Sequence, residues 1–306
     1  MRTLDRRGFL ENTAGIAAGL AGAGGAGALA ADVGSPAAPP AAPLGSTGVV
    51  LSRLGQGTGV RGGDRNSDQT RMGFEQLVAL FRHCYDRGVT FFDLADLYGT
   101  HVYFREALRH FPRESVTILT KMWWRYDGPE NETGLPHREQ AARTNLQRYL
   151  HELNADYLDV VLLHCLTTAD WPRHFGPYMD AISAAKERGE VRAAGVSCHD
   201  LGALKTAAVT PWVDVILARF NPRGVKMDAG AEEVAAVLRT ARQNGKAVLG
   251  MKILGEGDLA DQREACIEFA QGSGLLDALT IGFHAPAQVD EILHFLGKYP
   301  AAPLIA

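Results

Sequence analysis

Short apolar runs alternate with longer amphipathic stretches over most of the chain. Each run is bounded by polar residues or glycine, and some are apolar without interruption, which is typical of strands buried on both faces of a parallel sheet. A weaker run at the start of the series supplies a first strand. The runs that predict strands cover residues 51–57, 89–92, 116–120, 158–163, 191–196, 213–218, 247–251 and 278–281.

Between the runs, apolar residues recur every three or four positions, as they do on one face of a helix. Stripes of this kind lie in residues 74–84, 142–153, 234–241 and 289–296. Strand–helix units with short connections, repeated eight times, predict a closed (β/α)8 TIM barrel over residues 48–306. An open doubly wound sheet is the alternative, but the GxGxxG motif of that fold does not follow the first strand.

The N-terminal residues differ from the rest in composition. Arg6-Arg7-Gly8-Phe9-Leu10 is a twin-arginine pattern, an Ala/Gly run follows, and Ala28-Leu29-Ala30 offers a small-x-small site for a signal peptidase. We therefore expect a twin-arginine signal peptide in residues 1–31 and a disordered Pro/Ala-rich linker in residues 32–47. These features predict export by the twin-arginine machinery to a periplasmic or other extracytoplasmic space. The Ala/Gly run is too weakly apolar for a stable span, so we expect no transmembrane segment in the mature protein.

Composition and charge indicate which kinds of binding partner the chain can have. The chain has 306 residues, 46% of them apolar, and a formal net charge of −4, which gives no reason to expect nucleic acid as a partner. Its four cysteines are far apart and form no CxxC pair, and we predict no metal site.

Ionisable side chains end three successive predicted strands. Asp93, Lys121 and His164 directly follow apolar runs, and Tyr98 comes five residues after Asp93. In a parallel barrel the carboxyl ends of the strands surround one mouth, so we expect these four side chains to share a site. An acid, a phenol, an amine and an imidazole in one opening suit proton transfer.

The segments that carry these residues resemble a known family. FDLADLYG (92–99), LTK (119–121) and LLH (162–164) are similar to the Asp/Tyr/Lys/His tetrad of the aldo/keto reductases, and GVS (195–197) resembles that family's Gly-Val-Ser-Asn segment. The resemblance runs in order from Leu54 to about Leu296. It implies a nicotinamide-dependent oxidoreductase that uses NADP or NAD and acts on a small-molecule carbonyl or sugar-like substrate.

The chemistry also follows from the residue types. Reduction of a carbonyl needs a proton donor, and a free tyrosine, with a pKa of about 10, must be tuned for that task. We expect Lys121 to lower the pKa of Tyr98, Asp93 to hold the ammonium, and His164 to orient the substrate. A hydride must come from a cofactor, because no side chain supplies one. Other interpretations remain open: Lys121 and Asp93 as an ordinary ion pair, His164 as a core residue, or Lys121 as the Schiff-base amine of an aldolase-like lyase.

The resemblance also implies a cofactor pocket, in which several customary residues are replaced. Cys198 stands where asparagine is usual, Leu217 replaces a glutamine, and Met251 replaces a tyrosine that stacks on the nicotinamide. Gly282-Phe283-His284 replaces the Lys/Ser/Arg set that holds the 2′-phosphate of NADP. The cofactor-binding residues that the resemblance implies are Gly57, Thr58, Ser197, Cys198, Met251, Lys252, Leu254, Gly282 and Gln288.

Two further features bear on function. Trp123 and Trp124 follow Lys121 closely, so we expect them at the rim of the mouth, where aromatic side chains suit a ring-bearing or sugar-like substrate. The replaced pocket residues leave a second hypothesis open, that of a barrel that binds a dinucleotide or sugar without turnover.

Overall fold

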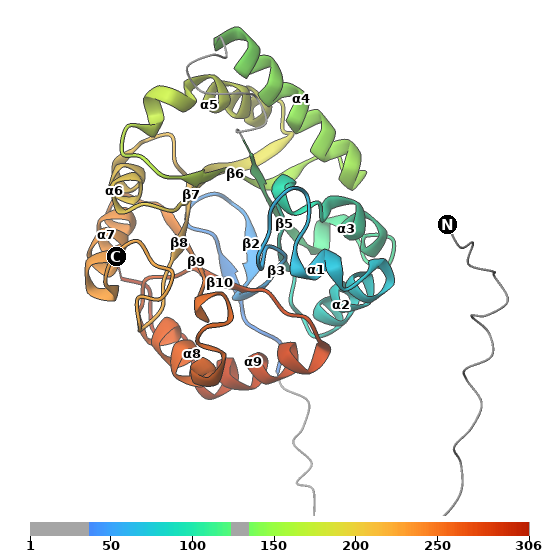
Figure 1. The fold of residues 1–306 in the computed structure, drawn as a ribbon, viewed down its shortest axis with the longest axis vertical. Helices are drawn as coiled ribbons and strands as arrows, with labels where there is room; N and C mark the ends of the chain where they lie inside the picture. The colour runs from blue at the N-terminus through green and yellow to red at the C-terminus, as the bar shows by residue number, and fades with distance from the viewer. Residues whose placement is uncertain (1–36, 124–134, 306) are drawn as a thin grey trace, which may run out of the picture. The chain divides into compact units, whose positions relative to one another are not determined.

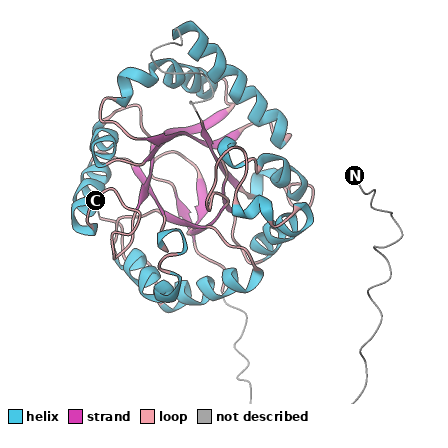
Figure 2. Ribbon diagram, in the orientation of Figure 1, coloured by secondary structure: helices cyan, strands magenta, loops and turns pink. Residues whose placement is uncertain are grey.

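Eight parallel strands close into a barrel, and their order around it follows the chain (Figures 1 and 2). The computed structural model describes residues 37–123 and 135–305. The last strand pairs with the first, Leu279 opposite Leu54, which closes the ring. The strands are β3 (Leu54–Gly57), β4 (Phe91–Asp93), β5 (Thr117–Met122), β6 (Leu158–Leu166), β7 (Val191–Cys198), β8 (Val215–Arg219), β9 (Ala247–Met251) and β10 (Ala278–Ile281).

Helices follow every strand and surround the barrel (Figure 2). They are α1 (Asp68–Arg71), α2 (Phe74–Asp86), α3 (His101–Ala107), α4 (Leu135–Leu153), α5 (Trp171–Glu187), α6 (Leu201–Val209), α7 (Ala231–Gln243), α8 (Arg263–Gly272) and α9 (Pro286–Lys298). The (β/α)8 prediction is confirmed, and the open sheet is excluded by the pairing of β10 with β3. Within the described residues, none of these helices has the length and apolarity needed to cross a membrane.

The alternation of side chains along each strand divides the core into two layers. Along β7, Ala193 belongs to the cluster inside the barrel, whereas Ala194 and Val196 pack in the larger cluster between strands and helices. The same alternation places Leu119 of β5 and Leu162 of β6 inside the barrel. The inward-facing residue that follows Leu119 on β5, or Leu162 on β6, therefore lies at the carboxyl end of the strand, at the mouth of the barrel.

A short hairpin closes the opposite end of the barrel. Its strands are β1 (Ala41–Pro43) and β2 (Val50–Ser52), and it lies within the ring of strands in Figure 1. Leu44 at its turn is fully buried in the inner cluster, and the Thr117 hydroxyl at the start of β5 donates to the Val50 carbonyl.

The position of this hairpin corrects the expected linker boundary. Residues 41–47, expected to belong to a disordered linker over 32–47, include β1 and the buried Leu44, so this part belongs to the barrel. Its burial is favourable because an open barrel end would expose the inner core to water. The proposed signal peptide lies outside the described residues.

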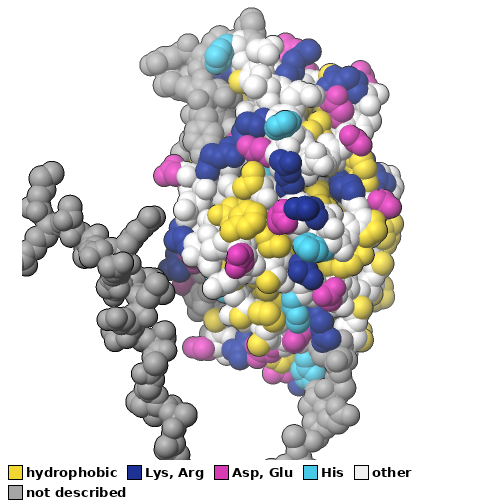
Figure 3. All heavy atoms as spheres, turned by 90° about the vertical axis from the view of Figure 1, so that its right-hand side faces the viewer, with side chains coloured by type: hydrophobic (Ala, Val, Ile, Leu, Met, Phe, Trp, Pro, Cys, Tyr) yellow, Lys and Arg dark blue, Asp and Glu magenta, His cyan; other side chains and the backbone are white. Residues whose placement is uncertain are grey.

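The outer surface of the helices carries charges of both signs. Figure 3 shows Lys and Arg interspersed with Asp and Glu on one face, with a hydrophobic patch among them. Among the exposed apolar residues are Phe74 on α2 and Val102 on α3. The face has no large area of a single charge, in keeping with the small net charge of −4.

Candidate active site

The four residues predicted to share a site do come together at the carboxyl end of the barrel. Asp93, Lys121 and His164 are inward-facing residues of the neighbouring strands β4, β5 and β6. Tyr98 ends a short 3-10 helix, Asp96–Tyr98, in the loop after β4. The alternation along the strands and the parallel order of the barrel are sufficient to bring these side chains together.

Lys121 is held at the bottom of this group by two acceptors. Its Nζ donates to the Asp93 carboxylate and, at 3.0 Å, to the Leu94 carbonyl. The lysine side chain is only 1% exposed, so its charge depends on Asp93 for compensation. This is the arrangement of an ammonium ion paired with a carboxylate. It differs from that of a free amine, which the lyase alternative requires.

Tyr98 and His164 meet edge to face above this pair. Tyr98 Oη and His164 Nε2 are 3.2 Å apart and share a hydrogen bond. The two ring planes are inclined at 84°, with their centroids 5.4 Å apart. Burial, followed by the nearby charge of Lys121, holds the pKa of His164 well below its ordinary value of 6.5, so the imidazole is neutral.

The electrostatics of Tyr98 differ from the sequence-based expectation. Burial raises the pKa of Tyr98 well above its ordinary value of 10.0, and Asp93 adds to this effect. The net shift of this pKa is therefore upward, opposite to the expected lowering, because burial outweighs any effect of the Lys121 charge. The lysine Nζ lies 4.7 Å from the centroid of the tyrosine ring, a cation–π position, and the acceptors of its protons are Asp93 and Leu94. The phenol stays protonated and can donate a proton.

Two glycines form the surface on which the Tyr98 ring lies. A Cβ on Gly59 would stand 2.2 Å from Tyr98 Cζ, and one on Gly62 would stand 2.6 Å from Tyr98 Cδ1. Atoms cannot approach so closely, so any side chain at these positions would displace the ring. No motif in the sequence singles out these glycines.

We expect Gly59→Ala to reduce turnover by more than about tenfold, because a shift of about 1 Å in a reacting group costs up to about 10²-fold. Gly63→Ala is the matched control, since a Cβ there meets nothing within 4 Å. Steady-state rates of both variants measure the loss of turnover, and their circular dichroism spectra check that both are folded. Equal activity in the two variants would show that the position of the Tyr98 ring is not critical.

A buried charge network fixes the loop that carries Tyr98. Asp96 has no exposed surface and accepts from Arg65 at 2.5 Å and from Arg148 of α4 at 2.8 Å. Both arginines also pair with Glu152, whose pKa falls to about 2 although burial alone would raise it. The lowering comes from hydrogen bonds and charge, first from His101 and then from Arg148. The loop is thereby anchored to two other parts of the chain.

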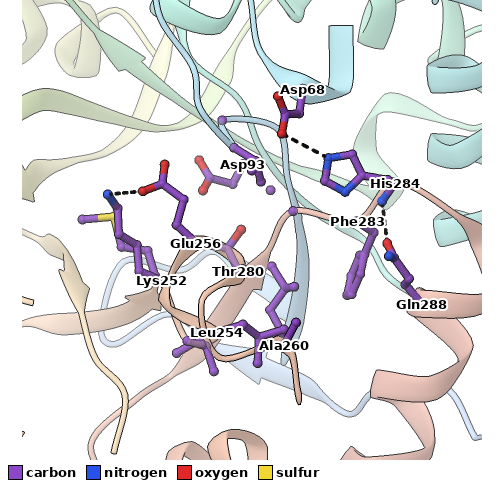
Figure 4. A pocket seen from close by; sticks show the side chains of 18 of the residues that line it. Asp68, Asp93, Lys252, Leu254, Glu256, Ala260, Thr280, Phe283, His284 and Gln288 are labelled. Carbon is purple, nitrogen blue, oxygen red and sulfur yellow. Dashed lines mark hydrogen bonds and ion pairs between the residues drawn. The ribbon is translucent and has the colours of Figure 1, made fainter. Parts of the chain in front are cut away.

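A cavity of about 760 Å³ opens beside three of the four residues. Figure 4 shows part of its lining, with Asp93 among the labelled residues. Its volume falls in the range of small-molecule and cofactor sites. Asp93, Tyr98 and Lys121 line it, and the rest of its wall comes mainly from the loops that follow β3, β9 and β10. Of the predicted cofactor residues, those that line it are Gly57, Met251, Lys252, Leu254, Gly282 and Gln288.

The cavity has features that suit a bound group. Thr280 Oγ1 in its wall is buried and has no hydrogen-bond partner among the described residues. Ser197 Oγ, the last inward-facing group of β7, is also buried without a partner among the described residues, but it does not line this cavity. Gly57 and Gly282 keep their part of the wall open, because a Cβ on Gly282 would stand 2.3 Å from Val60. The Thr280 hydroxyl and the glycines of the wall fit the amide and hydroxyl groups of a nicotinamide dinucleotide.

Besides Ser197, two predicted cofactor residues do not line the cavity. Cys198 follows Ser197 and so faces the helices, where it packs without exposure in the outer core cluster and is not part of the cavity wall. Thr58 is also fully buried, and its hydroxyl donates to the Asp93 carbonyl at 2.8 Å. The structure therefore gives Cys198 a packing role, and Thr58 a role in fixing the end of β4.

One of the two predicted rim tryptophans can be placed. The Trp123 ring lies 5.4 Å from that of His164, centroid to centroid, and the side chain is partly exposed. An aromatic wall beside His164 agrees with the prediction that Trp123 borders the mouth. Trp124 lies outside the described residues.

Two carboxylates that the sequence analysis did not single out, Asp68 and Glu256, also border the cavity. In Figure 4, Lys252 reaches Glu256 at 3.4 Å, and His284 lies 3.8 Å from Asp68. The backbone N–H of His284 donates to Gln288 Oε1 at 2.8 Å. No local motif marks Asp68, at the start of α1, or Glu256, in the short 3-10 helix Gly255–Gly257, so their place in the cavity follows only from the closed barrel.

The family is established by comparison with known proteins. A family model described as the aldo/keto reductase family matches residues 53–280, from the start of β3 into β10. The chain belongs to the aldo/keto reductase family. The resemblance carried by the tetrad segments is thereby confirmed at the level of the family.

Relatives in this family differ in the cofactor that their names state. The NADH-specific methylglyoxal reductase of Escherichia coli (strain K12) is 27% identical over 194 residues, which are 58% of this chain and 58% of that protein. The aldo-keto reductase yakc [NADP(+)] of Schizosaccharomyces pombe is 22% identical over 205 residues, 65% of this chain and 58% of that protein. The matched part thus spans little more than half the length of either relative.

Solved structures of the family share the fold. The holo form of an aldo-keto reductase from Bacillus halodurans superposes with a TM-score of 0.62 at 18% identity, covering 87% of this chain and 92% of that one. At this identity the likeness concerns the fold.

Proposed function

We propose that this aldo/keto reductase family member is an oxidoreductase that reduces the carbonyl group of a small molecule with a nicotinamide cofactor. The observation that carries the proposal is the hydrogen bond between Tyr98 Oη and His164 Nε2 above the buried Lys121–Asp93 pair. The geometry provides two neutral donors that can meet one carbonyl oxygen.

Each residue of the site has a separate role in this proposed reaction. Tyr98 donates the proton to the carbonyl oxygen, and its raised pKa keeps it in the donor form. The neutral His164 donates a hydrogen bond to the same oxygen and orients the substrate. Lys121 lies under the tyrosine ring, where its charge stabilises the phenolate that remains after transfer. Gly57, Met251, Gly282 and the Thr280 hydroxyl, which line the cavity, would hold the cofactor, which supplies the hydride when bound.

The direct test combines binding with turnover. We expect the purified protein to bind a reduced nicotinamide dinucleotide and to consume it when aldehydes are added, followed by absorbance. Binding without consumption across a panel of aldehydes, ketones and sugars would overturn the catalytic proposal.

That outcome would favour the second candidate, a barrel that binds a dinucleotide without turnover. The observation in its favour is that Leu217, which replaces the customary glutamine, is fully buried in the inner core, and that Met251 lines the cavity in place of a tyrosine.

Borohydride treatment in the presence of a carbonyl compound tests the lyase alternative, because only a Schiff base on Lys121 would be trapped.

We also propose that the protein is exported by the twin-arginine route. The support is the pattern of Arg6-Arg7, the Ala/Gly run and Ala28-Leu29-Ala30. Replacing Arg6 and Arg7 by lysine should leave the protein in the cytoplasm at its unprocessed mass. If cell fractionation of this variant matched that of the native protein, export would not depend on these arginines.

A further inference from the structure

The cavity beside Tyr98 is lined by charges that cancel one another. Its wall in the described part of the chain contains five lysine or arginine residues and five carboxylates. The cations are Arg61, Lys121, Lys226, Lys252 and Arg263, and the carboxylates are Asp68, Asp93, Glu256, Asp258 and Glu291.

Every one of these cations is paired with one of these carboxylates. Two of these pairs were described above, namely Lys121 with Asp93 and Lys252 with Glu256. The others are Arg61 with Asp68 at 2.5 Å, Arg263 with Glu291 at 2.8 Å, and Lys226 with Asp258 at 3.8 Å.

The remaining basic group, His284, adds no charge of its own. Its imidazole lies 3.8 Å from Asp68, and burial keeps its pKa below the ordinary value of 6.5. Asp68 is only 8% exposed and also accepts from Arg71. This carboxylate is thus a fixed part of the wall and a strong acceptor for hydroxyl groups.

We propose that the cavity selects NAD(H) over NADP(H), with Asp68 and the paired cations as the discriminating groups. NADP differs from NAD by a 2′-phosphate on the adenosine ribose, and a phosphate monoester carries about −1.5 to −2 charges at pH 7. A phosphate that enters this cavity finds each lysine and arginine of the described wall already paired, so it competes with a carboxylate for that cation. A ribose hydroxyl at the same place can donate to a carboxylate.

The pyrophosphate does not alter this comparison. Both dinucleotides carry it, so its cost or gain in the cavity cancels when their affinities are compared. Only the added phosphate distinguishes the two ligands. The inference rests on the proposed function in one respect, that this cavity receives a nicotinamide dinucleotide.

Isothermal titration of the full chain with NAD⁺ and with NADP⁺ tests the proposal without any turnover. We expect NAD⁺ to bind at least about tenfold more tightly, because like charges brought together at a site are strongly unfavourable. Tighter binding of NADP⁺, or equal affinity, would overturn the proposal and leave the proposed reductase function intact. Failure of both ligands to bind would overturn both.

A variant tests the electrostatic reason. His284→Arg adds one cation beside Asp68 and should raise the affinity for NADP⁺ by about tenfold, with less than about twofold change for NAD⁺. His294→Arg is the matched control, since it adds the same charge at an exposed position of α9 away from the cavity wall. A preference for NAD⁺ that is unchanged in His284→Arg would overturn the charge-balance explanation.

Discussion

Tyr98→Phe should lower the turnover number for carbonyl reduction by about 10²- to 10⁴-fold, the usual contribution of a positioned acid. The substitution removes Oη and its 3.2 Å hydrogen bond to His164 Nε2. It leaves the ring on Gly59 and Gly62 and over Lys121, so the fold and the cavity wall are preserved. We expect dinucleotide affinity to change by less than about twofold, and stability by about 1 kcal/mol for the lost hydrogen bond.

The measurement is therefore a comparison of turnover with binding in the same preparation. A variant that binds the dinucleotide normally but no longer reduces carbonyls assigns the proton to Tyr98. Equal rates in variant and native protein would remove Tyr98 from the mechanism.

The native pH profile gives an independent control on this assignment. Tyr98 titrates above its ordinary pKa of 10.0 because it is buried, and His164 titrates below its ordinary 6.5 because of burial and the charge of Lys121. Both groups keep one protonation state between these values, with the phenol protonated and the imidazole neutral. The kcat/KM for reduction should then be flat from about pH 6.5 to about 10, as far as these groups determine it.

The barrel and the tetrad could be predicted from the sequence for one physical reason. Strands of a parallel barrel are buried on both faces, so they form apolar runs, and their ends carry the site. Asp93, Lys121 and His164 mark such ends directly. The run predicted over 158–163 extends in the structure to Leu166, and its register against β7 shifts between Leu163 and Leu166, where Cys165 has a φ of 59°. Local hydrophobicity gives no sign of that irregularity.

The parts that were missed depend on contacts between distant segments. The β1–β2 hairpin has the Pro/Ala-rich composition of a linker, and only the open end of the finished barrel makes burial of Leu44 favourable. Arg65 and Arg148 reach Asp96 across 31 and 52 residues of sequence, so no spacing rule would pair them. The packing of Cys198 gives its predicted cofactor role no support, since strand alternation puts its side chain on the face opposite to Ser197.

Lys121→Met should destabilise the protein by about 3–5 kcal/mol, because it leaves the Asp93 carboxylate buried without a counter-ion. Lys121 is 1% exposed and Asp93 is 8% exposed in their side chains, so solvent cannot replace the lost partner. Methionine fills a similar volume, which limits the contribution of a cavity. Urea unfolding of the variant and native protein measures the difference.

Loss of activity in Lys121→Met alone could come from lost catalysis or from lost stability. The double variant Lys121→Met/Asp93→Leu separates these two causes. With both charges removed, the penalty of an unpaired buried carboxylate disappears, and we expect stability to return to within about 1 kcal/mol of the native value. Turnover should remain low, because no cation then lies 4.7 Å from the Tyr98 ring to stabilise the phenolate. A stable and fully active double variant would show that the pair only supports the fold. The ammonium would then have no part in proton transfer. The reactivity of Tyr98 would instead depend on its orientation by Gly59, Gly62 and the Asp96 network.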